Sequence, residues 1–331
     1  MIITRTPFRI SFFGGGTDYP AWYRSHGGSV LATTIDKYCY ITCRRLPPFF
    51  EHRHRIVYSR IETVARNEDI EHPAVRAVFN WANITEGLEI HHDGDLPARS
   101  GLGSSSAFTV GLTHALYGLR GRMASQRELA QDAIHIEQDL IRENVGSQDQ
   151  VSAAFGGLNR IDFHRDDTFS VAPVILPASR REELQKHLML CFTGFARTAD
   201  AIAKSKIDNM KNREKELTRM GEMVDEAIAI LMSGNTSVEE FGRLLDESWK
   251  YTRSLSDKVS TPEIDAMYEQ AIRAGALGGK ILGAGGGGFM LLFARPEDRL
   301  AIREKLKGLV HVDFKFESSG SRVVLYQPQG L

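Results

Sequence analysis

The chain has 331 residues, of which 41 are Lys or Arg, 42 are Asp or Glu and 42% are hydrophobic, giving a formal net charge of −1 at pH 7. Such a balance provides no long-range field that attracts nucleic acid or a membrane surface, and we expect neither as a partner. At roughly 150 residues per domain, the length predicts about two domains with ample core.

Cysteine usage and apolar runs narrow the class further. Three cysteines in a chain of this length form no disulfide framework, and Cys39, Cys43 and Cys191 lack the spacing of a zinc site. No stretch approaches the roughly 18 consecutive apolar residues of a membrane span. Residues 1–13 lack the apolar core of a secretory leader. We therefore expect a cytoplasmic, enzyme-sized protein with free thiols.

In the first half of the chain, strand-like and helix-like runs alternate. Short β-type runs predict strands at residues 8–13, 37–44, 55–59 and 88–92. Apolar residues at helical spacing predict helices after Pro73 and over 104–119. A capping box that begins at Ser125 predicts a further helix, running past Glu137 towards Ile141. A short helix near Asp149 is expected to end at two consecutive glycines.

The second half is richer in helices. Short polar and proline-bearing segments at 165–177 predict a domain junction, and we place the domains at residues 1–180 and 181–331. Further elements are expected in this order: a strand at 188–192, helices at 199–234, 238–255 and 262–274, a strand at 289–293, a helix at 296–306 and two terminal strands.

The most informative segment, residues 95–107, reads Asp-Leu-Pro-Ala-Arg-Ser-Gly-Leu-Gly-Ser-Ser-Ser-Ala and opens a predicted helix. Glycines let the backbone approach an anion, and a helix N-terminus offers free N–H groups with partial positive charge. A plain serine N-cap after a flexible turn is the alternative, but it needs no glycine pair. Phosphate binding is therefore favoured, through Gly101, Leu102, Gly103, Ser104, Ser105 and Ser106.

Two common nucleotide motifs do not account for the chain. No Gly-x-x-x-x-Gly-Lys-Ser/Thr sequence occurs. Gly283, Gly285 and Gly288 match the dinucleotide fingerprint, but that motif requires a helix directly afterwards, and here a predicted strand follows. A glycine-rich loop before a strand still suits close approach of the backbone to a ligand or to another loop.

Carboxylates near these loops suit phosphoryl transfer, which needs a metal and a group that orients or deprotonates the attacking hydroxyl. Glu137 and Asp149, together with a serine hydroxyl, supply the residue types for both roles. Asp18 follows a turn of three glycines at the end of a predicted strand, where it suits hydrogen bonding to sugar hydroxyls. An Asx turn is the alternative for Asp18.

In sequence and order, segments 7–18, 97–107 and 281–289 resemble the three motifs of the GHMP kinase superfamily (galacto-, homoserine, mevalonate and phosphomevalonate kinases). The resemblance implies an α+β architecture of two domains with the active site between them. The amino-terminal α/β domain is expected to contain a left-handed crossover, against the usual handedness, and the carboxy-terminal domain is expected to be ferredoxin-like.

The first motif most resembles sugar 1-kinases of the D-glycero-D-manno-heptose 7-phosphate type. Galactokinases carry Gly-Glu-His-Thr-Asp at this point, and the present sequence has Gly15 and Gly16 in place of the Glu and His. The implied reaction is ATP-dependent phosphorylation of the anomeric hydroxyl of the heptose 7-phosphate, which gives the 1,7-bisphosphate. The implied pathway is the biosynthesis of nucleotide-activated heptose for surface polysaccharide. A kinase acting on fucose, mannose or an N-acetylhexosamine remains an alternative, as does a non-catalytic sugar sensor.

The resemblance also implies roles for individual residues. Asp149 matches the catalytic aspartate and Arg9 the arginine that flanks it, while Ser104 and Glu137 match magnesium ligands. Sugar contacts are implied for Gly15, Gly16, Thr17, Asp18, Thr193, Arg197, Gly285 and Gly286. The implied cofactors are ATP and Mg²⁺, the implied partner is a small-molecule sugar phosphate, and a homodimer is left open.

Two parts of the implied site have no assigned residues. A 7-phosphate requires at least one cation, for which the candidates are Arg99, Lys37, Arg197 and Lys280. The adenine is expected against residues 58–81, where no side chain has diagnostic chemistry.

Overall fold

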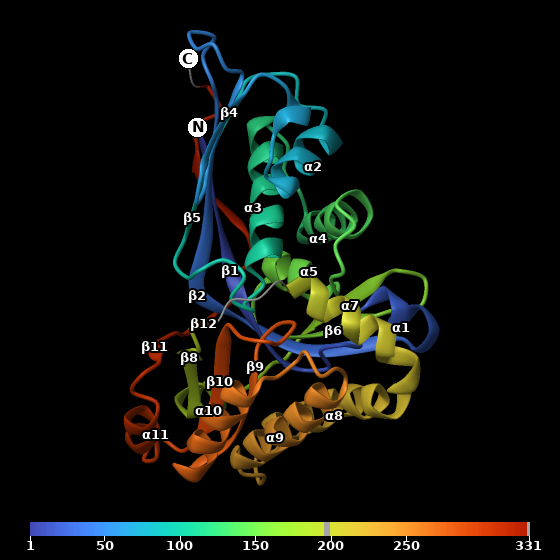
Figure 1. The fold of residues 1–331 in the computed structure, drawn as a ribbon, viewed down its shortest axis with the longest axis vertical. Helices are drawn as coiled ribbons and strands as arrows, with labels where there is room; N and C mark the ends of the chain where they lie inside the picture. Colours follow the sequence, from blue (N-terminus) through green and yellow to red (C-terminus); the bar gives the residue numbers. More distant parts are fainter. Residues whose placement is uncertain (195–198, 330–331) are drawn as a thin grey trace.

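Two sheets, one towards each end of an elongated molecule, organise the chain (Figure 1). This computed structural model describes residues 1–194 and 199–329. The larger sheet has nine strands: β1 (Ile2–Phe13), β2 (Gly28–Arg45), β3 (His54–Val57), β4 (Ile61–Val64), β5 (Leu88–Gly94), β6 (Asn159–Phe163), β7 (Phe169–Pro173), β12 (Phe316–Glu317) and β13 (Arg322–Tyr326). Within the described residues, no helix is long and apolar enough to span a bilayer.

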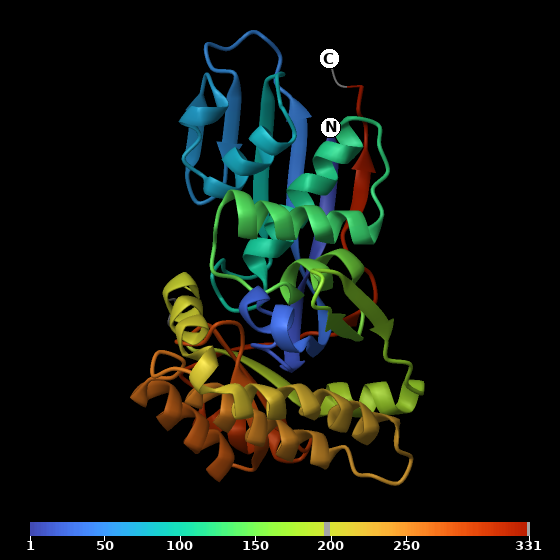
Figure 2. The ribbon, with the colours of Figure 1, turned by 90° about the vertical axis from the view of Figure 1, so that its right-hand side faces the viewer.

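Helices cover one face of this sheet. They are α1 (Pro20–His26), α2 (Pro73–Trp81), α3 (Ser104–Leu119), α4 (Gln126–His135) and α5 (Gln148–Phe155), whereas α6 (Ala178–His187) leads into the smaller sheet. Helix α3 lies along β1 and β2, with α2 and α4 beside it (Figures 1 and 2). The predicted helix from Ser125 is confirmed, but its last turn, Ile136–Leu140, is a π-helix.

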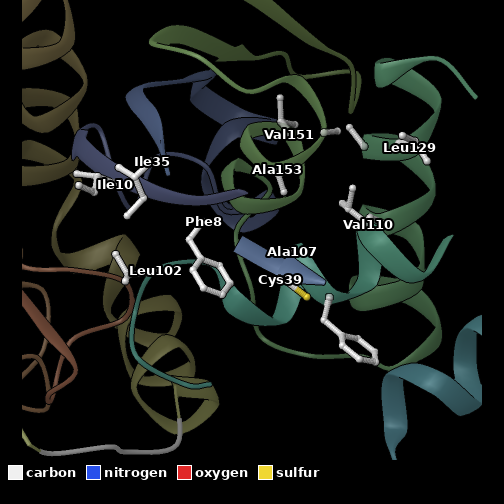
Figure 3. Packing of buried hydrophobic residues seen from close by; sticks show 14 of the residues in the cluster. Phe8, Ile10, Ile35, Cys39, Leu102, Ala107, Val110, Leu129, Val151 and Ala153 are labelled. Atoms are coloured by element: carbon white, nitrogen blue, oxygen red, sulfur yellow. The ribbon is translucent and has the colours of Figure 1, made fainter. Parts of the chain in front are cut away.

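Close packing fixes the position of α3 against the sheet. Cys39 lies buried on β2, and Phe8 on β1 meets Leu102 and Ala107 from the beginning of α3 (Figure 3). A Cβ atom at Gly111 would lie 2.9 Å from the Thr6 hydroxyl, so the backbone of α3 comes close to β1. The three cysteines are free and buried, as expected.

The smaller sheet confirms the ferredoxin-like prediction. Its strands are β8 (Leu188–Phe192), β9 (Ala276–Ile281), β10 (Phe289–Ala294) and β11 (Val310–Val312), all antiparallel in the order β11-β8-β10-β9. Helices α7 (Ala199–Asn209), α8 (Glu214–Met232), α9 (Glu239–Ser254) and α10 (Pro262–Arg273) connect β8 to β9, and α11 (Arg299–Lys305) connects β10 to β11. This is the βαββαβ chain order of that fold.

Several elements differ from the sequence-based expectation. The helix expected over 199–234 is broken at Met210–Asn212, a 3₁₀ turn in which Met210 is buried. Strand β9 was not expected, because it contains Gly278 and Gly279. A Cβ atom on Gly278 would lie 2.0 Å from the carbonyl oxygen of Gly242, so the glycine lets α9 pack closely against this strand.

The structure has two lobes, one built on each sheet, and the boundary between them differs in detail from the predicted division into domains. Segment 165–177 contains the turn and the second strand of a hairpin, because β7 pairs with β6 in the larger sheet. The terminal strands β12 and β13 return to that sheet and pair with β2 and β1. The division at residue 180 therefore falls inside α6, and it stays a prediction, as does the handedness of the crossover.

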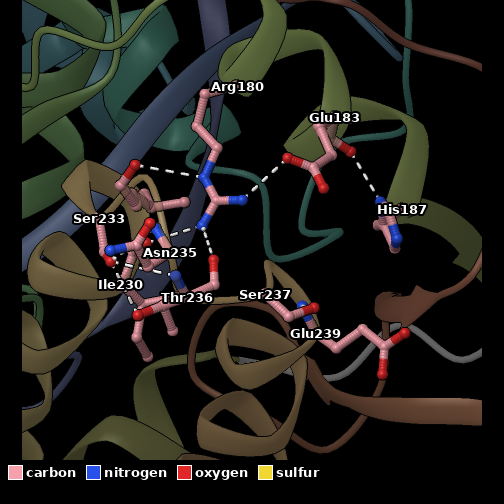
Figure 4. A network of polar contacts seen from close by, with 10 residues as sticks. Arg180, Glu183, His187, Ile230, Ser233, Asn235, Thr236, Ser237 and Glu239 are labelled. Atoms are coloured by element: carbon pink, nitrogen blue, oxygen red, sulfur yellow. Dashed lines mark hydrogen bonds and ion pairs between the residues drawn. The ribbon is translucent and has the colours of Figure 1, made fainter.

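Arg180 on α6 ties the beginning of the second lobe to helix α8. Its guanidinium donates hydrogen bonds to the carbonyl oxygens of Ile230 at 2.8 Å and Thr236 at 2.7 Å, and to the Glu183 carboxylate at 2.8 Å (Figure 4). The last carbonyl groups of a helix have no partner within it, and Arg180 supplies one. The orientation of α6 against the end of α8 is thereby fixed.

Candidate active site

A buried arginine binds both carboxylate oxygens of the candidate catalytic aspartate. Arg9 Nε donates to Asp149 Oδ1 at 2.7 Å and Nη2 donates to Oδ2 at 2.9 Å, while Nη1 donates to the Gly101 carbonyl oxygen at 2.6 Å. The Arg9 side chain is 3% exposed, but that of Asp149 is 26% exposed. A bidentate pair fixes orientation as well as charge, so Asp149 is held in place yet remains accessible.

The glycine-serine loop reaches the same point from the N-terminus of α3. Gly103 stands before the helix at φ +73°, and a Cβ atom on it would lie 3.1 Å from Arg9 Cγ and 3.4 Å from Asp149 Oδ2. No side chain caps this helix start, so its first N–H groups are left for a ligand. This observation favours the phosphate loop over the simple serine cap.

The glycine-rich third motif packs directly against this loop. A Cβ atom on Gly283 would lie 2.7 Å from Gly101 Cα, and one on Gly288 would lie 2.3 Å from the Ser100 carbonyl oxygen. Phe289 N donates to that oxygen at 3.0 Å. The sequence left open whether these glycines allow close approach to a ligand or to another loop. The structure shows close approach to another loop.

The serine that faces Glu137 is not the expected one. Ser106 Oγ donates to Glu137 Oε2 at 2.8 Å, and Gln150 Nε2 donates to the same oxygen. Ser104 Oγ instead accepts a hydrogen bond from Arg99 N at 3.1 Å. Glu137 is fully buried, and burial raises its pKa to about 7. Its second oxygen, Oε1, has no hydrogen-bond partner within the described residues.

An orphaned carboxylate oxygen beside a serine hydroxyl fits a hard divalent cation, which prefers oxygen ligands. Within residues 1–194 and 199–329, no group of three or more His, Cys, Asp or Glu side chains forms a complete protein cage. Mg²⁺ does not need one, because it usually binds through one or two carboxylates plus substrate phosphates and water. The residues around Glu137 are therefore chemically suited to Mg²⁺ held jointly with a nucleotide.

The raised pKa of Glu137 predicts a dependence of stability on pH in protein free of metal. Because the folded state keeps this proton to higher pH than the unfolded chain, its contribution is full below about pH 4.5 and is lost as pH rises through about 7. The loss is on the order of 3 kcal/mol. Glu137→Gln lacks this titration, so its stability relative to the wild type should increase between pH 4.5 and 8.

Urea unfolding in EDTA at pH 4.5 and pH 8 measures this change. Glu68→Gln, at an exposed position, provides the control and should shift little relative to the wild type between the two pH values. An advantage for Glu137→Gln that is the same at both pH values would contradict the assignment.

The first motif places Asp18 beside the beginning of α5. Asp18 is buried, and its carboxylate accepts hydrogen bonds from Gly16 N at 2.9 Å and Gln148 N at 3.4 Å. Burial raises its pKa, and the nearby charge of Asp149 acts in the same direction. The Thr17 hydroxyl is engaged by the backbone, since it donates to the carbonyl oxygens of Gly14 and Ser29. Thr17 thus holds the turn that presents Asp18.

The remaining expected sugar contacts divide into three groups. Gly15 has space around it, because a Cβ atom there would meet its nearest neighbours only at 3.7 Å. The Thr193 hydroxyl is used locally, donating to the Gly288 carbonyl oxygen at 2.9 Å. Gly286 N donates to the Val259 carbonyl oxygen at 2.8 Å, and the adjacent Gly285 also packs against Val259. Arg197 lies outside the described residues.

Two buried lysines complete the charged surroundings. Lys280, on β9, is one of the expected cation candidates, whereas sequence reasoning missed Lys206 on α7. A signal for Lys206 does exist, because it shares the spacing of Ile202, Ala203 and Met210, which are all buried. A lysine at an apolar position of an amphipathic helix indicates a charge held inside the protein.

The fold and the site together define a phosphotransferase that acts on an alcohol group, with a glycine-serine loop at a helix N-terminus beside an aspartate that Arg9 holds. Residues 69–157 match the GHMP kinases N terminal domain, and residues 231–311 match the GHMP kinases C terminal model. The chain belongs to the GHMP kinase family. The motif-based prediction of the family is confirmed.

Similar proteins include several sugar kinases. A D-glycero-alpha-D-manno-heptose 7-phosphate kinase of Campylobacter jejuni is 30% identical over 96% of this chain and 97% of its own length. A galactokinase of Thermococcus kodakarensis is 27% identical over 86% of both chains. The crystal structure of a D-glycero-D-manno-heptose 1-phosphate kinase from Bacteroides thetaiotaomicron has a TM-score of 0.80 at 22% identity, covering 98% of each chain.

Proposed function

We propose that this chain transfers a phosphoryl group from MgATP to the anomeric hydroxyl of D-glycero-D-manno-heptose 7-phosphate. The observation that carries the reaction is the Arg9–Asp149 pair, held directly against the N-terminus of α3 by Gly103. Support for the acceptor comes from similarity to the heptose 7-phosphate kinase of Campylobacter jejuni and from Gly15 and Gly16 in the first motif.

In this proposal, Asp149 accepts the proton of the attacking hydroxyl, and Arg9 orients the carboxylate towards it. The N–H groups of Gly103, Ser104 and Ser105 bind the nucleotide phosphates, where a helix N-terminus stabilises negative charge. Asp18 and the open backbone at Gly15 contact the sugar, while Gly16, which packs against Leu217, holds the turn between them. The other residues implied for the sugar are proposed as supports or contacts: Thr17, Thr193, Arg197, Gly285 and Gly286.

Glu137, with Ser106 as its nearest hydroxyl, is proposed to hold Mg²⁺. The ion supplies charge neutralisation on the phosphate oxygens when it is bound. Ser104 remains a candidate ligand from the motif, although its hydroxyl contacts Arg99 N in this structure. The cytoplasmic location and a homodimer also stay proposals.

The two serines predict different magnesium titrations. We expect Ser106→Ala to raise the Mg²⁺ concentration at half-maximal activity by about tenfold, because one charge-assisted oxygen contact is lost. Ser104→Ala should change it by about twofold at most. Activity measured against free Mg²⁺ at saturating ATP checks both values, and the reverse ranking would return the ligand role to Ser104.

Coupled ADP-release assays test the proposed acceptor. They compare heptose 7-phosphate with unphosphorylated heptose, mannose, fucose, galactose and N-acetylhexosamine under the same conditions. The highest kcat/KM is expected for heptose 7-phosphate. A higher value for fucose would favour a fucokinase, as in the bifunctional fucokinase/GDP-fucose pyrophosphorylase of Arabidopsis thaliana, which is 25% identical over 93% of this chain and 31% of its own length. No ADP release with any sugar would instead favour the sugar sensor.

A further inference from the structure

Two lysines lie buried between the lobes, next to the sugar motif. The side chains of Lys206 and Lys280 are only 6% and 5% exposed. Lys280 Nζ donates one hydrogen bond, at 3.1 Å, to the carbonyl oxygen of Phe12, which stands two residues before Gly14. Lys206 comes from α7, which Asp200 links to the loop before α5 by accepting a hydrogen bond from a backbone N–H of that loop. Lys280 therefore lies beside the first motif, and the charge of Asp18 acts on both lysines, which places the two ammonium groups near that residue.

The charges in this region do not balance. Arg9, Lys206 and Lys280 provide three cations against the carboxylates of Asp18 and Asp149. Within the described residues, neither lysine ammonium lies within 4.0 Å of a carboxylate. An ammonium group has three donors, and Lys280 uses one of them. Buried charge without a partner is costly in a low-dielectric interior, so the cluster favours entry of an anion.

The titration behaviour agrees with this reading. Burial, followed by the neighbouring charges of Lys206 and Arg9, lowers the pKa of Lys280 to about 7. Burial lowers the pKa of Lys206 to about 8, partly opposed by Asp18. A ligand with negative charge would oppose these effects and favour the protonated form of both lysines.

Neutralising Asp18 is the simplest other role for the lysines. Asp18 already accepts hydrogen bonds from Gly16 N and Gln148 N, and burial raises its pKa, which makes two further cations an excess. The other cation candidates are less suited. Lys37 Nζ is engaged by its neighbour Asp36 at 3.1 Å, and Arg99 is exposed on the loop that precedes α3.

We propose that Lys206 and Lys280 together bind the phosphate ester of the acceptor sugar. This phosphate is at the end of the sugar distant from the hydroxyl that reacts. The inference rests on the proposed function and deepens it, because it names the side chains that distinguish a sugar phosphate from a free sugar. Both ammonium groups come from the second lobe, and Lys280 contacts Phe12 of the first lobe, so one phosphate bound between them bridges α7 and β9 beside the first motif. Specificity for a phosphorylated acceptor thereby depends on how the second lobe packs against the first motif, where Lys280 contacts Phe12.

Calorimetric binding in the absence of nucleotide tests this site with heptose 7-phosphate and unphosphorylated heptose as probes. Lys206→Met and Lys280→Met should each weaken binding of heptose 7-phosphate by about 10- to 100-fold, the range of a charge-assisted contact. Binding of heptose should change by about twofold at most. Lys250→Met provides the matched control, because Lys250 is an exposed lysine of the second lobe that pairs with Asp246 at 2.7 Å.

Stability provides a second readout. Methionine replaces a buried ammonium with an apolar chain of similar length, so each variant should melt at or above the temperature of the ligand-free wild type. Heptose 7-phosphate should then raise the melting temperature of the wild type more than that of either variant. If a methionine variant does not fold, Lys206→Gln and Lys280→Gln replace it in the same comparison.

The outcomes separate this inference from the proposed function. If the wild type prefers heptose 7-phosphate to heptose and both variants keep that preference, the lysine site is wrong and the proposed function stands. Equal weakening for both sugars would overturn the site as well, because it would show that the lysines only support Asp18. A wild type without any preference would remove the heptose 7-phosphate proposal before a variant is compared, and the lysine site with it.

Discussion

Asp149→Asn is expected to lower kcat by about 10²- to 10⁴-fold, the usual contribution of a positioned general base, while the KM for ATP changes by about twofold at most. The substitution keeps the size of the side chain and leaves an oxygen that still accepts from Arg9. It removes the second carboxylate oxygen and, with it, the capacity to take a proton from the sugar hydroxyl. The phosphate loop contacts Arg9 through the Gly101 carbonyl oxygen, so this loop should remain in place.

Steady-state kinetics with ATP and sugar varied separately measure this split. Asp313→Asn, which removes charge from an aspartate paired with Arg303 at 3.0 Å in the second lobe, provides the control and should leave kcat unchanged. Near-normal turnover in Asp149→Asn would remove the base assignment. A large rise in the KM for ATP with normal kcat would show instead that Asp149 supports the phosphate loop.

How far the sequence predicts this site depends on whether a role is local. The position of the glycine-serine loop could be predicted because its residue types lie within one segment, where glycines precede a run of serines, and the helix does begin at Ser104. The choice of serine could not. Ser104 and Ser106 lie about 160° apart around α3, because each residue advances the helix by about 100°, so which one faces Glu137 depends on the rotation of the helix. That rotation is set by packing of Gly111 against β1, a contact between distant segments.

The same reason explains the missed lysine and the missed strand. The role proposed for Lys206 depends on the packing of α7 beside Tyr19 and Trp22, which lie more than 180 residues earlier in the chain. Strand β9 contains Gly278 and Gly279, which have low intrinsic preference for strands. They are needed because α9 lies close to that strand, which the sequence of β9 alone does not reveal. Confirmed elements such as α3 and β8 instead carry their signal locally, as a long apolar segment after a serine run in α3 and a short continuous apolar run in β8.

The contact between the second and third motifs leads to the other large expected effect. Gly101 has φ +85°, and a Cβ atom on it would lie 2.2 Å from the carbonyl oxygen of Leu282. Gly101→Ala therefore combines an unfavourable backbone conformation, about 1–2 kcal/mol, with an overlap against backbone that costs about 1–3 kcal/mol. We expect a loss of about 3 kcal/mol in the free energy of unfolding.

The kinetic consequence should appear in the nucleotide site. Moving Gly101 away from Leu282 also moves the carbonyl oxygen that accepts from Arg9 and shifts the start of α3. The KM for ATP is therefore expected to rise by about tenfold or more, as the free N–H groups lose their alignment with the phosphates. Gly283→Ala approaches the same contact from the other side, 2.7 Å from Gly101 Cα, and should act similarly.

Gly121→Ala separates backbone strain from the loop contact. Gly121 also has positive φ, +68°, but the nearest heavy atom to an added Cβ is the Tyr326 hydroxyl oxygen at 4.0 Å. This control should lose only the conformational part of the stability, about 1–2 kcal/mol, and should keep its KM for ATP. Urea unfolding and initial rates at varied ATP measure both quantities. If Gly101→Ala and Gly121→Ala were equally stable and bound ATP equally well, the third motif would have no part in holding the phosphate loop.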